Sequence, residues 1–492
     1  MSLQEEEAAR LQKLNTLIEK NINPYPARAT RTHTISQILL GWDELVKKEE
    51  KIILVGRIKT KRAHGGLIFA NLEDGTDAIQ IALKRDHIGE ETFNLFNNIY
   101  DLGDFIEVEG SLFLTKTEQK TLEVKRMVML TKSLLPLPEK WHGLSDTEIR
   151  YRKRYLDLIS NKEVRDIFQK RGAILKAIRD FFDSRGYLEV ETPILQSIPG
   201  GANAKPFITH HNALDIDLYL RVAPELHLKR LLVGGIERVY EIARCFRNEG
   251  IDHLHNPEFT QIEAYEAYAN YNTYMEMIEE LLPSTIEKIG LDAAHVPFND
   301  TFIDFTPPYP RITFRDAIKK ETRFDINDAK DRSSLAKAAL KLGVEVAKDW
   351  SHGKIFDEIY KKHVRTKILN PVFIIDHPIE LSPLSKVHPN DPTKVERFQL
   401  VLGEGTELVN AFSELNDPID QENRFKKQDE ARGAGDEEAQ YGDANFVDAL
   451  KHGMPPAAGL GIGIDRLTAL LTNSHSIKEV ILFPTLRPES EE

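Results

Sequence analysis

The sequence predicts an α+β protein in which a small β-barrel precedes a larger domain of mixed strands and helices. Five short apolar segments between residues 51 and 130 are separated by glycine and aspartate turns, as strands are. A proline-containing stretch at 135–145 then interrupts the pattern. Beyond it, helical and strand-like periodicities alternate to the end of the chain. We therefore expect two main folding units.

Composition excludes several classes of protein. A chain of 492 residues predicts two to four domains. No apolar run approaches the roughly 18 residues that span a bilayer, and the acidic N-terminus does not resemble a secretory signal. Cys245 is the only cysteine, which excludes an intramolecular disulfide and cysteine-based zinc sites. The net charge of −13 leaves RNA binding to a local basic patch. We expect a soluble, cytoplasmic enzyme.

The first domain is predicted to combine helices and a barrel. Residues 1–50 form a helical segment, with one helix over 1–20 and a second over 35–49 that begins after Thr34 or Ser36. Residues 51–135 form a barrel of the OB type, although a generic small β domain fits the pattern equally well. Its strands are expected to start at residue 52 and to cover 67–72, 78–83, 105–113 and 122–130. A linker follows at 136–150.

The second domain, residues 151–492, opens with helices. A basic helical stretch is expected from residue 149, and a longer helix over 162–185 ends at Gly186. Residues 181–195 then read as a helix, a glycine stop and a strand that contains Pro193. Residues 324–365 are helix-rich, and we interpret them as an insertion.

A second motif joins two strand-like pieces, 244–250 and 255–265, through a polar loop. The permanently charged, planar guanidinium of Arg247 suits an α-phosphate whose charge grows during displacement. Glu249 could accept a hydrogen bond from an adenine amino group, and Phe259 offers a flat face for the base. A surface salt bridge and a core phenylalanine are the plainer alternatives.

A third motif, at 458–471, places three glycines at alternate positions of an apolar strand. Because they do not lie in a strand-to-helix turn, they form neither a P-loop nor a dinucleotide-binding fingerprint. Alternating glycines bare one face of a strand, so that a ligand can approach the backbone closely. Arg466 opens the following helix, from which its side chain could reach a γ-phosphate.

Together, in this order and spacing, the three motifs resemble motifs 1, 2 and 3 of the class II aminoacyl-tRNA synthetases. The finer resemblance is to the lysyl-tRNA synthetases of subclass IIb, on residues 198–212, 221–230 and 410–417, and it covers nearly the whole chain. It implies an antiparallel sheet flanked by helices, an OB domain that binds the anticodon, and a homodimer built by the segment around Pro193.

The resemblance also implies a two-step reaction. The lysine carboxylate attacks the α-phosphorus of ATP, giving lysyl-adenylate and pyrophosphate, and the 3′ hydroxyl of tRNA(Lys) then attacks the carbonyl carbon. No covalent enzyme intermediate is needed, so catalysis rests on positioning and charge stabilisation. ATP, L-lysine and tRNA(Lys) are thus the expected partners, with no membrane.

Site residues follow from matching positions. Arg247 and Arg466 would be catalytic, and the residues implied for ATP are Arg247, Glu249, His255, Asn256, Phe259, Glu407 and Arg466. The residues implied for lysine are Gly201, Glu225, Glu263, Tyr265, Asn410 and Glu414. A buried ammonium needs carboxylates and hydrogen bonds to offset its desolvation. We therefore assign Glu263, Glu414 and Tyr265 to the ammonium end, and Glu225 to the α-amino group. For each glutamate, a surface position is the alternative.

Two to three Mg²⁺ ions should accompany ATP, because its phosphate charge must be neutralised. Glu407 and Glu414 are the implied ligands. The chain departs from its relatives here, since Gln399 stands where they usually carry glutamate, and 403–407 holds one extra residue. Glu404 offers a substitute carboxylate.

For the anticodon, Phe69 and Gln80 are expected to stack on and read bases, while Lys61 and Arg62 contact phosphates or base edges. A core phenylalanine and a surface glutamine are the alternative. Paired histidines at 210–211 and at 253 and 255 are not expected to form a zinc site. In the first pair, adjacent residues of a strand point to opposite faces.

Three rival functions remain open. A synthetase for aspartate or asparagine would need a cationic residue facing the substrate side chain, whereas residues 223–226 and the Glu263 and Tyr265 pair resemble those of a lysine enzyme. A truncated relative that lysylates a protein would lack the barrel. An inactive paralogue that binds RNA is supported only by Gln399, and it is opposed by Arg247, Glu249 and Arg466.

Overall fold

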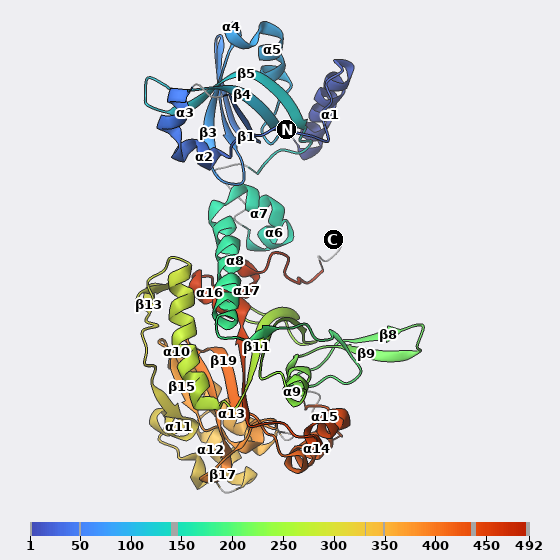
Figure 1. The fold of residues 1–492 in the computed structure, drawn as a ribbon, viewed down its shortest axis with the longest axis vertical. Coiled ribbons are helices and arrows are strands. Elements are labelled where there is room, and N and C mark those ends of the chain that lie inside the picture. Colours follow the sequence, from blue (N-terminus) through green and yellow to red (C-terminus); the bar gives the residue numbers. More distant parts are fainter. Residues whose placement is uncertain are drawn as a thin grey trace. The chain divides into compact units, whose positions relative to one another are not determined.

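The computed structural model describes residues 2–48, 51–138, 146–329, 331–347, 350–433 and 439–488. It divides into two compact units, Met1–Ser145 and Asp146–Glu492 (Figure 1). Residues 139–145 of the predicted linker lie outside the described residues, as does the last residue of the predicted helix at 35–49.

The first unit contains a closed five-stranded barrel with the order β1-β2-β3-β5-β4, which confirms the predicted OB-type barrel. Its strands are β1 Ile52–His64, β2 Leu67–Glu73, β3 Ala78–Lys84, β4 Phe105–Leu114 and β5 Lys120–Thr131. Buried and half-buried residues alternate strictly along β2, as expected for a strand with one face in a core. Helices α4 (Arg85–Ile88) and α5 (Glu90–Asn98) connect β3 to β4 and were not predicted.

Three N-terminal helices share the core of the barrel. They are α1 Leu3–Glu19, α2 Ile35–Leu40 and α3 Trp42–Lys48. Thr34 caps α2 in a reciprocal capping box with Gln37, and Gly41 divides the single helix predicted at 35–49 into two. Leu17, Ile38 and Trp42 are buried in the same cluster as the barrel strands. The N-terminal segment and the barrel therefore bury one continuous core.

The second unit is built on an eight-stranded sheet with the order β14-β15-β18-β19-β20-β11-β10-β6. The strands are β6 Leu188–Glu189, β10 Arg238–Phe246, β11 Glu258–Ala267, β14 Arg311–Thr313, β15 Val372–Ile375, β18 Arg397–Leu402, β19 Thr406–Ser413 and β20 Ala457–Gly463. Strands β15 to β10 pair antiparallel, whereas β14 and β6 join the two edges in parallel. The sheet is therefore mixed at its edges rather than wholly antiparallel.

One face of this sheet is covered by three helices, α8 (Lys162–Asp183), α10 (Tyr271–Lys288) and α16 (Ile464–Leu471) (Figure 1). Side chains at alternate strand positions enter this core, among them Ile262 of β11, Leu400 of β18 and Leu460 of β20. Because strand side chains alternate between faces, the residues between them project to the opposite side.

The opposite face carries two separate apolar clusters. One gathers α9 (Glu225–Val233), α14 (Pro418–Gly433) and α15 (Ala444–Lys451). The other gathers α11 (Phe314–Thr322), α12 (Arg332–Lys341) and α13 (His352–His363), so the helix-rich stretch at 324–365 packs on the sheet. The remaining described elements are β7 Leu195–Gln196, β8 Ile208–His211, β9 Ile216–Leu220, β12 Val296–Phe298, β13 Thr301–Ile303, β16 Val387–His388, β17 Asp391–Val395, α6 Thr147–Arg152, α7 Arg154–Ser160, α17 Ile477–Val480, η1 Ile326–Asp328, η2 Arg365–Lys367 and η3 Ile379–Leu381.

Candidate active site

A cavity of about 530 Å³ lies on the same face of the sheet as the two clusters, over the part that they do not cover. Its floor is a row of cross-strand neighbours, Glu263, Gly461, Asn410 and Gln399, on β11, β20, β19 and β18. Residues directly opposite on paired strands project to the same face, so the row points into the cavity. Gly459, Gly461 and Gly463 of the third motif line it together, as the alternating glycines predict.

The cavity gathers almost all of the predicted site residues. Its walls include Gly201, Glu225, Arg247, Glu249, His255, Asn256, Phe259, Glu263, Tyr265, Glu407, Asn410 and Arg466. Glu414 is the one predicted ATP or lysine residue that is not on its wall; its side chain is buried, with a carboxylate oxygen close to Gly459. Residues separated by more than 250 positions in sequence therefore converge on one surface.

The carboxylate of Glu263 is buried and held by two neighbours. The Tyr265 hydroxyl donates to its Oε2 at 3.0 Å, and the Gln261 amide donates to its Oε1 at 2.6 Å. Burial, reinforced by the nearby charge of Glu225, raises the pKa of Glu263 well above its ordinary value. A cation that binds beside such a buried carboxylate stabilises its ionised form strongly.

A protein ammonium lies directly behind this part of the cavity. The Nζ atom of Lys229, which is fully buried, lies 2.5 Å from Glu225 Oε1 and also contacts the Glu414 carboxylate. The Phe412 and Phe446 rings lie 5.3 and 5.9 Å from it. Burial raises the pKa of Glu414 to about 8, even though the Lys229 charge opposes the shift. Burial also raises the pKa of Glu225.

Sequence reasoning did not identify Lys229. The signal was present, because Glu225 and Lys229 are four residues apart on one helix and so lie on the same face. The structure also joins Glu225 and Glu414 through one ammonium. It therefore does not separate them into an α-amino end and an ammonium end, as the sequence-based assignment does.

Cationic side chains gather farther along β11. The Arg247 guanidinium lies 4.9 Å from the centroid of the Phe259 ring, a cation–π contact. Arg466 Nη1 donates to the Glu407 carbonyl at 2.9 Å, and its Nη2 lies 3.4 Å from His255 Nε2. Phe259 and Glu263 share a face of β11 and are four residues apart, or about 13 Å at roughly 3.3 Å per residue. Arg247 and Arg466 therefore lie at one end of the cavity and the carboxylates of Glu225 and Glu263 at the other. A further guanidinium, that of Arg397, lines the cavity and donates to the Asn410 amide oxygen at 2.8 Å.

Asn256 holds the loop of the second motif in place. Its amide nitrogen donates to the Glu258 carbonyl at 2.6 Å, and its amide oxygen accepts from the Thr485 backbone at 3.2 Å. His255 contacts Asp252 through Nδ1 at 2.9 Å. Glu249 is exposed at the cavity edge, where it is accessible to a ligand.

The two predicted metal ligands lie toward opposite ends of one strand. Glu407 lies near the start of β19 and Glu414 immediately follows its end, so about 23 Å separates their Cα atoms at about 3.3 Å per residue. Glu407 lines the cavity, whereas the Glu414 carboxylate contacts Lys229. Glu404 is exposed in the β18–β19 turn and does not line the cavity, so it does not replace the missing carboxylate.

Gln399 is occupied by a neighbour. Its Oε1 lies 3.2 Å from Nε2 of His377, a buried histidine whose pKa burial lowers to about 3. Among the described residues, no three histidine, cysteine or acidic side chains are grouped so as to hold a metal.

The helix-rich stretch at 324–365 contributes to the cavity, which sequence reasoning missed. Asp357, Lys361 and Arg365 all line it. They are spaced four residues apart on α13 and the 3₁₀ turn η2 that follows, so one charged stripe faces the site. Lys361 pairs with Asp357 at 2.6 Å, whereas Arg365 has no such partner among the described residues.

On the barrel, three predicted anticodon residues share a face. Arg62 is opposite Phe69 on β1 and β2, and Gln80 is opposite Asn71, which shares the Phe69 face of β2. Phe69 is half-buried, and Gln80 Oε1 accepts from the Thr121 hydroxyl at 2.9 Å. These side chains lie on the face away from the barrel core.

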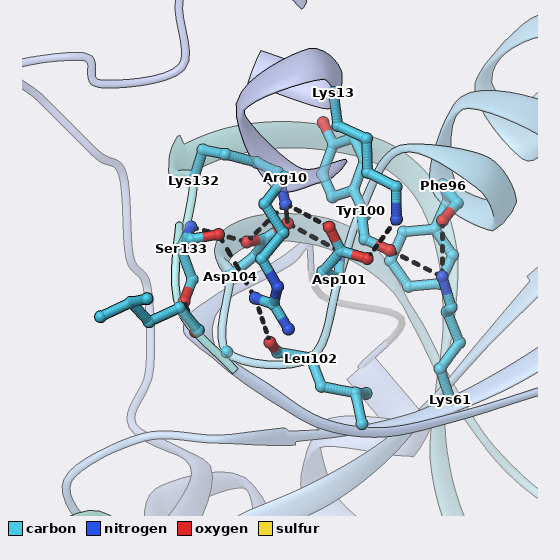
Figure 2. Close-up of polar contacts among 12 residues, drawn as sticks. Arg10, Lys13, Lys61, Phe96, Tyr100, Asp101, Leu102, Asp104, Lys132 and Ser133 are labelled. Carbon is cyan, nitrogen blue, oxygen red and sulfur yellow. Dashed lines mark hydrogen bonds and ion pairs between the residues drawn. The ribbon is translucent and has the colours of Figure 1, made fainter. Parts of the chain in front are cut away.

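Lys61 has a different role from the predicted one. Its Nζ atom donates to the backbone carbonyls of Phe96, Asn97 and Tyr100 at 3.2, 3.0 and 2.6 Å, at the C-terminal end of α5 (Figure 2). Figure 2 also shows a buried network beside it, in which Lys132 binds Asp101 and Asp104. The structure therefore assigns Lys61 to the support of a helix end, and the predicted RNA contact is not supported.

None of the described helices has both the length and the apolar composition needed to cross a membrane.

Comparisons with known proteins agree with this arrangement. Residues 146–487 match the model of the class II tRNA synthetases for aspartate, lysine and asparagine, and residues 52–130 match an OB-fold nucleic-acid-binding domain. Lysine–tRNA ligase of Syntrophomonas wolfei is 48% identical over 100% of this chain and 99% of its own length. Those of Pelotomaculum thermopropionicum and Roseiflexus sp. are 50% and 49% identical, over 97% and 99% of this chain and 94% and 100% of their own lengths. The chain therefore belongs to the class II tRNA synthetases and, among them, to the lysine–tRNA ligases.

Proposed function

We propose that lysine activation takes place in the cavity on the uncovered sheet face, with lysine at the Glu225 and Glu263 end and ATP at the Arg247 and Arg466 end. The single observation that carries this proposal is the separation of buried carboxylates from guanidinium groups along β11. A substrate with two amino groups fits the anionic end. A polyphosphate fits the cationic end.

In this arrangement the lysine carboxylate points along the strand toward the arginines and attacks the α-phosphorus of ATP. Arg247, stacked on Phe259, is placed to bind the phosphoryl oxygens on which charge develops, and it holds them from a fixed position. Arg466 binds the leaving pyrophosphate. The bond between the α-phosphorus and the bridging oxygen breaks as the mixed anhydride forms, and the 3′ hydroxyl of tRNA(Lys) later displaces AMP.

The protein's contribution is positioning. Effective molarities of well-oriented groups are large, so holding the carboxylate in line with the scissile bond accounts for much of the acceleration. Glu263, supported by Tyr265 and Gln261, fixes the far end of the substrate. A synthetase for aspartate or asparagine is disfavoured, because Glu263 offers no cation to a carboxylate or amide side chain.

Mg²⁺ fits the phosphate end. It usually binds through one or two carboxylates together with substrate phosphates, and Glu407 supplies one such carboxylate. The ion supplies neutralisation of phosphate charge when bound. With Gln399 neutral, any second or third ion would depend chiefly on ATP itself. Equilibrium dialysis of Mg²⁺ with a non-hydrolysable ATP analogue would count the ions and test this.

We also propose a homodimer in the cytoplasm, where its tRNA is used. The segment after α8 exposes several large apolar side chains around β6 to β9, at Leu188, Ile194, Leu195, Ile208, Leu214 and Ile216. Exposed apolar side chains gathered on one segment favour association. Sedimentation equilibrium of the wild type and Ile194→Glu tests the dimer: the variant should be monomeric, and a wild-type monomer would refute the proposal.

The two ends of the cavity are tested separately. Glu263→Gln should raise the KM for lysine roughly 10- to 100-fold with little change for ATP, because it removes a charged partner of the amine. Arg466→Ala should raise the KM for ATP with little change in the KM for lysine. If both variants affected both substrates equally, the proposed division of the cavity would be wrong.

A further inference from the structure

Arg365 is a cation of the cavity that no motif of the sequence explains. It lines the same wall as Glu407 and Arg466, and it comes from η2, directly after α13. Its Nε atom is buried and has no hydrogen-bond partner among the described residues, and the same holds for Nε of Arg247. Buried donors are almost always satisfied, so these two N–H groups point to a ligand that accepts hydrogen bonds.

The guanidinium groups of Arg247, Arg365 and Arg466 gather here, with the carboxylates of Glu407 and Asp252 nearby. Burial lowers the pKa of Arg466, the charges of Arg247 and Arg365 lower it further, and Glu407 and Asp252 oppose the shift. Arg365 and Arg247 are thus close enough to Arg466 for like charges to repel. Protein folds rarely collect like charges without a counter-charge, and a polyanionic ligand would supply it.

The fold holds Arg365 in place through the irregular turn between β18 and β19. Backbone amides of Gly403 and Glu404 donate to the carbonyls of Leu369 and Ile368, both at 2.8 Å. Gly405 has φ +116°, and a Cβ there would lie only 3.4 Å from Thr366 Cα. The β18–β19 turn is therefore the surface against which the segment after Arg365 packs.

Two side chains across this cavity bear on its need for metal. Gln399 of β18 is neutral, and Arg365 adds a positive charge. A divalent cation and a guanidinium offset the same phosphate charge. A protein cation at this place therefore reduces the phosphate charge that a bound metal must neutralise.

We propose that Arg365 is a third phosphate-binding arginine, which binds the β- and γ-phosphates of ATP beside Arg466 and reduces the dependence of nucleotide binding on Mg²⁺. The planar fork of donors suits two phosphate oxygens at once. This inference rests on the proposed placement of ATP at the cationic end of the cavity.

Calorimetric titration with α,β-methylene-ATP and with AMP tests it, using wild type, Arg365→Ala and Arg365→Lys, with Mg²⁺ and with a chelator. We expect Arg365→Ala to weaken binding of the triphosphate roughly 10- to 100-fold and to leave AMP binding unchanged. The loss should be larger in chelator. Arg365→Lys keeps the charge but loses the planar fork of donors. Its affinity for the triphosphate should lie between those of the wild type and Arg365→Ala.

Lys367→Ala is the matched control, since Lys367 lies on the same 3₁₀ turn but pairs with Glu321 at 2.6 Å, away from the cavity. It should bind both nucleotides as the wild type does. If Arg365→Ala binds the triphosphate like the control while Arg466→Ala does not, the role of Arg365 is refuted and the ATP site stands. If Arg466→Ala and Arg247→Ala also bind it normally, the proposed ATP placement itself fails. An equal loss for AMP and the triphosphate in both Arg365 variants would show a general effect on the site and would contradict the proposal.

Discussion

Lys229 Nζ lies 2.5 Å from Glu225 Oε1, so an ammonium of the protein is already placed beside the carboxylates proposed to bind lysine. It also contacts Glu414, which leaves Glu263 without a cationic partner of its own. Three buried carboxylates surround one buried ammonium, and burial raises the pKa of all three carboxyl groups. A lysine substrate brings two ammonium groups, which would stabilise the ionised carboxylates, and this provides a charge basis for specificity.

Replacing Lys229 with methionine should destabilise the fold. The variant leaves Glu225 and Glu414 buried with no cation between them, and breaking a buried pair by removing one partner costs about 3–5 kcal/mol. Urea unfolding measures the change. Lys176→Met, which removes an exposed partner of Asp180 at 3.2 Å, is the control and should cost less than about 1 kcal/mol. Equal losses in the two variants would show that the Lys229 ion pairs contribute nothing.

Two glycines of β20 should respond differently to alanine. A Cβ on Gly459 would overlap the Glu414 carboxylate and the Tyr265 ring, whereas a Cβ on Gly461 would meet Glu263 Cγ at an ordinary 3.8 Å. Forcing an extra methyl into a packed site costs about 1–3 kcal/mol, so Gly459→Ala should raise the KM for lysine roughly 5- to 150-fold. Gly461→Ala serves as the neighbouring control. A larger effect in Gly461→Ala would contradict this packing.

Stability should depend on pH through Glu414. Burial raises its folded pKa to about 8 from 4.5, so between these values the folded protein binds more protons than the unfolded chain. The free energy of unfolding then falls as pH rises through this window. The lowered pKa of His377 has the opposite effect, but only below about 6.5. From pH 6.5 to 8 the wild type should lose about 1–2 kcal/mol relative to Glu414→Gln. Parallel pH profiles in urea unfolding would contradict this.

A substitution in the barrel should weaken tRNA binding without changing lysine activation. Stacking of a base on an aromatic side chain is worth about 1–3 kcal/mol, so Phe69→Ala should raise the KM for tRNA roughly 5- to 150-fold. Lysine-dependent ATP–pyrophosphate exchange should not change. Leu114→Ala, at an exposed apolar position of β4, is the comparison. If the two variants charge tRNA equally well, Phe69 does not stack on the anticodon.

Much of the fold was predictable because local patterns agree with it. The barrel strands, the cap at Thr34 and the glycine-bearing strand β20 each follow from short-range periodicity or side-chain chemistry. Helices α4 and α5 were missed, since they are short and lie between strands. The parallel pairing of edge strands β6 and β14 depends on tertiary contacts that no local window contains.

The site was only partly predictable. Residues within long motifs, such as Arg247 and Glu263, do line the cavity. Lys229, Arg365 and the true surroundings of Glu414 were not predicted, because each depends on what packs behind or across from it. The two predicted metal ligands, Glu407 and Glu414, lie toward opposite ends of β19, and this separation was not considered in the prediction. Lys61 was read from its position on a strand, although its ammonium reaches the end of a helix.

ATP–pyrophosphate exchange by the purified protein without tRNA, testing each amino acid singly, is the most direct test of the carboxylate-lined cavity. We predict exchange with lysine alone among the protein amino acids. Ornithine, one methylene shorter, should be about 10- to 200-fold poorer, and norleucine, which lacks the ammonium, should lose on the order of 10⁴, because the buried carboxylates then stay unpaired. Exchange with aspartate or asparagine, or norleucine as good a substrate as ornithine, would contradict the proposed pairing of Glu263 and its neighbours with the substrate ammonium.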